Sequence, residues 1–116
     1  MSKKVLKNLD ILKVISKCKD KQRKALIEHA DADLIHALAE CCLNIINSNV
    51  PLTRTQKKKL KRYRKRLHDI SSSKVKINKK KKILKQKGGF LPLVIGPILS
   101  LLGGLAGRAI GKAAGL

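Results

Sequence analysis

The chain has 116 residues, with 28 Lys and Arg against 7 Asp and Glu, and a formal net charge of +21. Such a charge repels itself unless a polyanion neutralises it, so the expected partner is nucleic acid or an anionic membrane surface. The single Tyr, single Phe and absence of Trp exclude a platform on which single-stranded bases stack. No nucleophile, base and stabilising group occur together, so we expect neither an enzyme nor a cofactor.

Residues 1–52 predict a small helical module, with 9 basic and 6 acidic side chains. Apolar residues recur at three- and four-residue steps, which places them on helix faces. They are Val5, Leu9, Leu12 and Ile15 in a first helix, and Leu34, Leu38, Cys41 and Ile45 in a third. Asp20 is expected to cap a short second helix, Asp31 or Asp33 to open the third, and Pro51 to follow its end. Because three short helices bury little surface, self-association or packing on a partner is expected.

The cysteines Cys18, Cys41 and Cys42 lack the CxxC spacing of metal ligands. The three histidines do not complete a ligand pattern with them. We therefore expect no metal site.

Residues 53–73 predict one long basic amphipathic helix. Thr53 and Gln56 have the spacing of a capping box, so the helix should begin at Arg54. Leu60, Tyr63, Leu67 and Ile70 then form a narrow apolar seam surrounded by Lys and Arg. A rod that lies along phosphates is favoured over a solvated face docked on the first module.

Residues 74–89 form a lysine-rich segment whose pattern does not distinguish a helix from an extended chain. Together, residues 54–87 hold 17 of the 28 basic side chains and one acid, Asp69. The candidate phosphate-binding residues are Arg54, Lys57, Lys58, Lys59, Lys61, Arg62, Arg64, Lys65, Arg66, Lys74, Lys76, Lys79, Lys80, Lys81, Lys82 and Lys85. No base-reading set accompanies them, so binding to duplex DNA should not depend on sequence.

Residues 90–116 are an apolar tail that contains Gly and Pro. From Gly88 to Gly107 there are 20 residues without charge, near the length that spans hydrocarbon. Candidate residues for membrane contact or helix packing are Leu91, Val94, Ile98, Leu101, Leu102 and the glycines Gly103, Gly107, Gly111 and Gly115, which are spaced for close helix approach. A membrane-like tail and a tail packed in a protein assembly both fit this pattern.

The junction between the basic and apolar segments reads Gln86-Lys87-Gly88-Gly89-Phe90. It resembles the cleavage site of adenovirus-type maturation proteases, with a cut after Gly89. The order of basic segment, Gly-Gly and GGFLPLVIGPILSLL resembles the precursor of the adenovirus core protein pX (mu). Most of the chain, including NSNVPLTRTQKKKLKRYRKRL and KKKKILKQKGGFLP, resembles a small protein that accompanies Maverick (Polinton) elements and adintoviruses.

The resemblance implies a mainly α, non-enzymatic core protein that binds and condenses double-stranded DNA in a virion and in the host nucleus during assembly. It also implies an adenain-like protease as a partner, and a tail that contacts capsid proteins or membrane. Two other classes stay open. One is the precursor of a membrane-active or antimicrobial peptide released from residues 90–116, and the other is a host histone-like or ribosomal protein.

Overall fold

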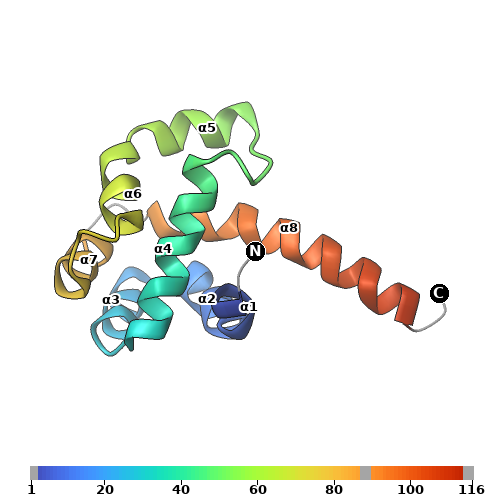
Figure 1. The fold of residues 1–116 in the computed structure, drawn as a ribbon, viewed down its shortest axis with the longest axis horizontal. Helices are drawn as coiled ribbons and strands as arrows, with labels where there is room; N and C mark the ends of the chain where they lie inside the picture. Colours follow the sequence, from blue (N-terminus) through green and yellow to red (C-terminus); the bar gives the residue numbers. More distant parts are fainter. Residues whose placement is uncertain (1–2, 87–89, 114–116) are drawn as a thin grey trace.

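The computed structural model describes residues 3–86 and 90–113, with side chains described for residues 3–86 and 90–102. These residues form eight helices and no strand, so the predicted mainly α class is confirmed. The helices are α1 (Lys3–Lys7), α2 (Leu9–Lys17), α3 (Asp20–Glu28), α4 (Ala32–Ile46), α5 (Arg54–Lys61), α6 (Arg64–Ser71), α7 (Ile77–Leu84) and α8 (Phe90–Ala113). Figure 1 shows α4 in the middle, α1–α3 beside its first turns, α5 and α6 around its other end, and α8 crossing it.

One hydrophobic core includes side chains from all eight described helices. Residues from all four predicted segments, 1–52, 53–73, 74–89 and 90–116, therefore contribute to this core. The predicted tail contributes to this core mainly through the start of α8. The buried side chains there, each at most 1% exposed, are Phe90, Leu91, Val94, Ile95 and Ile98. This part of α8 packs against α2, α4 and α5. Because α1–α4 alone offer little surface to bury, the apolar start of α8 supplies the surface that closes the core.

Two prolines are accommodated in α8 in different ways. Pro92 lies in the first turn, where backbone N–H groups have no partner within the helix. Pro97 lies inside the helix and removes one backbone hydrogen bond, yet the helix continues to Ala113. Within the described residues, no helix is both long and apolar enough to cross a membrane.

The predicted long basic helix is two helices, α5 and α6, which meet at Arg62 and Tyr63. At this point the backbone N–H of Tyr63 donates to the carbonyl of Leu60 at 2.9 Å, a tighter turn than in an α-helix. The change of direction lets Leu60, Leu67 and Ile70 all reach the core, where each is at most 4% exposed. The expectation of one continuous helix was therefore wrong, whereas the apolar seam is confirmed.

Helix starts in the first half differ in part from the prediction. The Asp31 carboxylate accepts a hydrogen bond from the Leu34 N–H at 2.8 Å, so Asp31 rather than Asp33 caps α4. Asp20 does not cap α3, because it is the first helical residue and Lys19 holds the cap position. The predicted first helix is also divided at Asn8, whose side chain donates to the Lys4 carbonyl at 2.7 Å.

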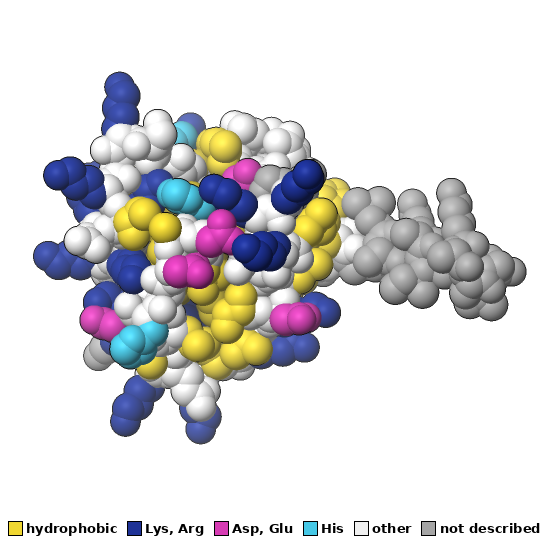
Figure 2. Space-filling view, turned by 60° about the horizontal axis from the view of Figure 1, so that its bottom comes forward, with side chains coloured by type: hydrophobic (Ala, Val, Ile, Leu, Met, Phe, Trp, Pro, Cys, Tyr) yellow, Lys and Arg dark blue, Asp and Glu magenta, His cyan; other side chains and the backbone are white. Residues whose placement is uncertain are grey.

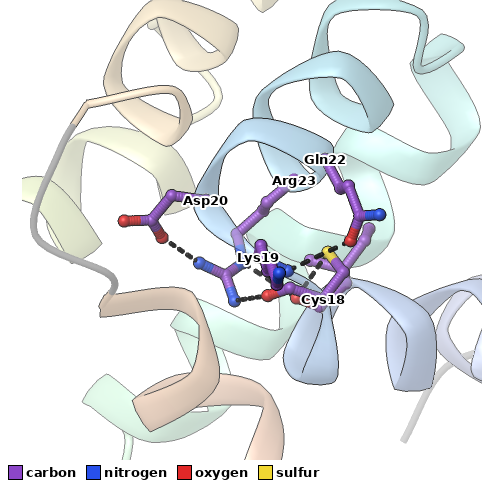
Figure 3. A network of polar contacts seen from close by, with 6 residues as sticks. Cys18, Lys19, Asp20, Gln22 and Arg23 are labelled. Atoms are coloured by element: carbon purple, nitrogen blue, oxygen red, sulfur yellow. Dashed lines mark hydrogen bonds and ion pairs between the residues drawn. The ribbon is translucent and has the colours of Figure 1, made fainter.

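The corner between α2 and α3 is held by Arg23, which is only 8% exposed (Figure 3). Its guanidinium donates to the carbonyls of Ile15 and Cys18, each at 2.8 Å, and pairs with Asp20 at 2.6 Å. The last carbonyls of a helix lack partners within it. Arg23 therefore satisfies the end of α2 and fixes the direction in which α3 leaves.

Candidate nucleic-acid interface

The basic surface begins at a capped helix start. The Thr53 N–H donates to the Gln56 side chain at 2.8 Å, and the Gln56 N–H donates to the Thr53 hydroxyl at 3.1 Å. This is the predicted capping box, and it satisfies two backbone positions at the start of α5. Most side chains of α5 are charged and contribute little to packing. The cap therefore determines where α5 begins, and the apolar seam determines which face of α5 contacts the rest of the protein.

Helices α5 and α6 present their basic side chains to solvent and their seam to the protein. The seam packs α6 on α4 and α5 on α8. The exposed basic side chains of this pair are Arg54, Lys57, Lys58, Lys59, Lys61, Arg62, Arg64 and Lys65. The ion pairs Lys7–Asp33, Arg23–Asp20 and Lys85–Glu28 lie on other helices. The α5–α6 surface therefore combines a fixed backbone with many solvated cations, the arrangement that phosphate contact needs.

The side chain of Tyr63 lies between two groups at the α5–α6 corner. Its ring stacks on that of Phe90 with centroids 5.5 Å apart and planes at 27°. The guanidinium carbon of Arg66 lies 5.5 Å from the centre of the Tyr63 ring. Arg66 is accordingly half-buried. It stabilises the α5–α6 corner through its contact with Tyr63 and also adds charge to the basic surface.

Helix α7 adds a second basic area, although the sequence left its structure open. An open hollow of about 690 Å³ is lined by lysines and by one carboxylate, Glu28 at the end of α3. The lysines are Lys76, Lys79, Lys81, Lys82 and Lys85. Lys85 Nζ lies 2.9 Å from the Glu28 carboxylate, and Lys81 Nζ lies 3.2 Å from the Glu28 carbonyl. Lys85, by this hydrogen bond and by its charge, holds the pKa of Glu28 below its usual range.

One predicted phosphate-binding residue does not lie on the surface. Lys80 is 5% exposed, because it belongs to the face of α7 that also carries the buried Ile83 and Leu84. Residues three and four positions apart share a helix face, so Lys80 follows these two residues towards the core. The predicted Lys74, Lys76, Lys79 and Lys82 are exposed, whereas Lys81 and Lys85 are half-buried beside Glu28.

Cys41 and Cys42 are buried residues of α4, whereas Cys18 is half-buried and follows the end of α2. Burial raises the pKa of the Cys41 thiol to about 12. Burial raises the pKa of the Cys42 thiol further, although the positive charge of Lys80 opposes this rise. A thiol that stays protonated is a poor nucleophile and a poor metal ligand. Among the residues that the structure describes, no three His, Cys, Asp or Glu side chains are grouped to hold a metal ion.

The predicted cleavage site lies only partly within the described residues. Lys87, Gly88 and Gly89 fall outside them. Gln86 is exposed, whereas Phe90 is 1% exposed and is the first residue of α8. A protease that grips residues on both sides of the cut must therefore draw Phe90 out of its place against Tyr63.

The predicted tail residues fall into two groups. Leu91, Val94, Ile98 and Leu102 are buried in the core, and Leu101 is half-buried. These residues pack inside the protein and are not a free membrane-contacting surface. The side chains from Gly103 to Gly115 lie outside the described side chains.

Two residues that matter here were missed in the sequence. Arg23 lies three residues after Asp20, a spacing that could have indicated an ion pair but not the two carbonyl contacts. Glu28 lies 57 residues from Lys85, and nothing in a single sequence joins them.

Comparisons with models of protein families, with curated proteins and with solved structures find no match for this chain.

Proposed function

We propose that this protein is a non-enzymatic DNA-binding protein that contacts the phosphates of double-stranded DNA through α5, α6 and the exposed lysines of α7. The observation that carries the proposal is the row of solvated cations on α5 and α6, held in place by a buried apolar seam. The only acid after residue 40 is Asp69, so few carboxylates compete with phosphates for these cations. Binding in this way is independent of base sequence and depends strongly on salt.

We further propose that the protein condenses DNA inside the virion of a Maverick-like element and acts in the host nucleus during assembly. The resemblance of the basic segment, Gly-Gly junction and apolar segment to viral core precursors supports this placement. Capsid proteins or membrane are, in this proposal, further partners of the protein. The burial of Phe90, Leu91, Val94 and Ile98 argues against a peptide precursor whose residues 90–116 act alone.

The first experiment measures the affinity of the full chain for two unrelated duplexes of equal length as a function of salt. If six to ten phosphates are neutralised, affinity should fall about a thousandfold or more between about 50 and 200 mM salt for both duplexes. A preference for one duplex that persists at high salt would contradict sequence-independent phosphate contact. Equal affinity for single-stranded RNA would favour the ribosomal class instead.

A matched pair of variants places the contact on the structure. Six cations of α5 and α6 are changed to Gln in one variant: Lys57, Lys58, Lys59, Lys61, Arg62 and Arg64. Six exposed lysines of the first three helices and their loop are changed in the other: Lys3, Lys4, Lys13, Lys17, Lys19 and Lys21. Both lose the same charge, so a much larger loss of affinity in the first variant supports the α5–α6 surface. Equal losses would show that only net charge matters.

A further inference from the structure

An open apolar groove lies between α2, α3 and the start of α4. It has a volume of about 700 Å³, and its apolar lining includes Ile11, Val14, Ala25, Leu26 and Leu34. Val14 is 49% exposed, which is high for a large aliphatic side chain on a helix with a core face. Figure 2 shows apolar side chains through the middle of one face of the molecule, with acidic, histidine and Lys or Arg side chains beside them.

The charge around the groove is unusual for this protein. Its lining contains Asp31 and no Lys or Arg, although the chain carries a net charge of +21. By contrast, the hollow between α4, α5 and α6 is lined by Lys57, Lys61 and Arg64. Residues 1–52, which form the groove, carry 9 basic and 6 acidic side chains, so the difference lies in the lining and not in this whole half of the chain. Because the lining holds Asp31 and no Lys or Arg, an apolar helix that carries positive charge matches it better than an acidic one.

The chain itself contains such a helix. Residues 103–113 of α8, here called the arm, include Leu105 and Ile110 among Gly and Ala, with Arg108 and Lys112 and no acid. Figure 1 shows this part of α8 continuing away from the other helices. At 1.5 Å per residue the arm extends about 16 Å, or three helical turns. Its small residues allow a close approach to another helix.

The arm cannot reach the groove of its own molecule without breaking α8. The first half of α8 is fixed in the core against α2, and the helix runs without interruption from Phe90 to Ala113. We therefore propose that the arm of one copy lies in the α2–α3 groove of a second copy. Because the contact joins two different surfaces, it is heterologous and adds copies one after another rather than closing as a symmetric pair. This inference does not depend on DNA binding.

The test uses complementary variants of the full chain without DNA, measured by sedimentation velocity over a range of concentrations. Val14→Lys places a positive charge in the groove, which repels Arg108 and Lys112 of the arm. Leu105→Glu with Ile110→Glu places charges among the apolar residues of the arm. The wild type should form species larger than a monomer, and each variant alone should lose them. An equimolar mixture of the two variants should form a 1:1 dimer that grows no further, because it contains one intact arm and one intact groove.

A matched control is Leu43→Lys, which places the same charge at a 41% exposed aliphatic residue of α4 outside the groove. It should associate like the wild type, and unchanged thermal unfolding should show that all variants are folded. The proposal is overturned if the wild type stays monomeric, if either variant alone associates normally, or if the mixture stays monomeric. Loss of binding to anionic vesicles in the arm variant, with wild-type chains that do not associate, would assign the arm to a membrane surface instead.

Discussion

The rings of Tyr63 and Phe90 stack with centroids 5.5 Å apart, and they are the only aromatic side chains of the chain. Tyr63 lies at the corner between the two basic helices, and Phe90 is the first residue of α8. The stack therefore fastens the basic surface to the apolar helix across the Gly-Gly junction that separates them in sequence. A charged half and an apolar half of the chain become one folded unit at this contact.

The stack should be measurable as a coupling between the two residues. In a double-mutant cycle with Tyr63→Leu and Phe90→Leu, we expect a coupling of about 0.5–1.5 kcal/mol in the free energy of unfolding, beyond the loss of buried area. Urea unfolding followed by far-ultraviolet circular dichroism gives the four values. Combining Tyr63→Leu with Val14→Ala on α2 should instead give additive losses. Additivity in the Tyr63–Phe90 cycle would show that the rings are merely near each other.

Local signals in the sequence predicted several helix faces and caps correctly. The capping box of Thr53 and Gln56 needs only residues three apart, and the seam of Leu60, Leu67 and Ile70 needs only helical spacing. What periodicity could not indicate is the partner of each face. Phe90 and Ile98 are buried in the core of this protein. The same apolar residues would give the same sequence pattern if they faced lipid or another chain. The choice depends on contacts between segments far apart in sequence.

Arg23 should be hard to replace even by another cation. Arg23→Lys keeps the charge but cannot donate to the Ile15 and Cys18 carbonyls and to Asp20 together. We expect a loss of about 1–3 kcal/mol in the free energy of unfolding, since buried carbonyls at the end of α2 lose their donors. Asp20→Asn should cost less than about 1 kcal/mol, because the Asp20 carboxylate is largely exposed. Urea unfolding of both variants tests this order, and a reversed order would mean that the ion pair dominates.

Glu28 should weaken DNA binding by the lysines of α7. Its carboxylate holds Lys85 and its carbonyl accepts from Lys81, so phosphates must compete for both amines. We expect Glu28→Gln to strengthen DNA binding and to steepen the salt dependence by about one phosphate contact. Fluorescence anisotropy with labelled duplex at several salt concentrations measures both quantities.

The control for this prediction is Asp33→Asn, which changes net charge equally but removes the partner of Lys7 between α1 and α4. An equal effect of both variants would attribute the gain to net charge. The pKa of Glu28 is lowered in the folded protein from 4.5, so the carboxylate stays charged at neutral pH. Its contribution is lost as the pH falls through the lowered folded value. The difference between wild type and Glu28→Gln should therefore shrink as the pH falls below 4.5.

The basic residues show the same limit of sequence reasoning at single positions. Lys79 and Lys80 are adjacent and chemically identical, yet one is exposed and the other is 5% exposed. The register of α7 decides between them, and Ile83 and Leu84 set that register by packing inwards. The number of lysines in the sequence therefore predicted that this region is basic. Which of those lysines are exposed could be known only from the folded structure.

The last prediction concerns a chain cut after Gly89. The sequence suggested that a cut would release the apolar tail, but Leu91, Val94, Ile95 and Ile98 are buried against α2, α4 and α5. Burying an aliphatic side chain contributes about 1.5–3 kcal/mol, so these residues should hold the two pieces together without a peptide bond.

To test this, residues 86–89 are replaced by the recognition sequence of a specific protease and the folded chain is cut. The pieces should co-elute in size-exclusion chromatography under native conditions and separate in denaturant. The same chain with Val94→Asp and Ile98→Asp should come apart when cut, which shows that the core is what holds it. Separation of the unmodified pieces under native conditions would restore the view of residues 90–116 as a releasable peptide.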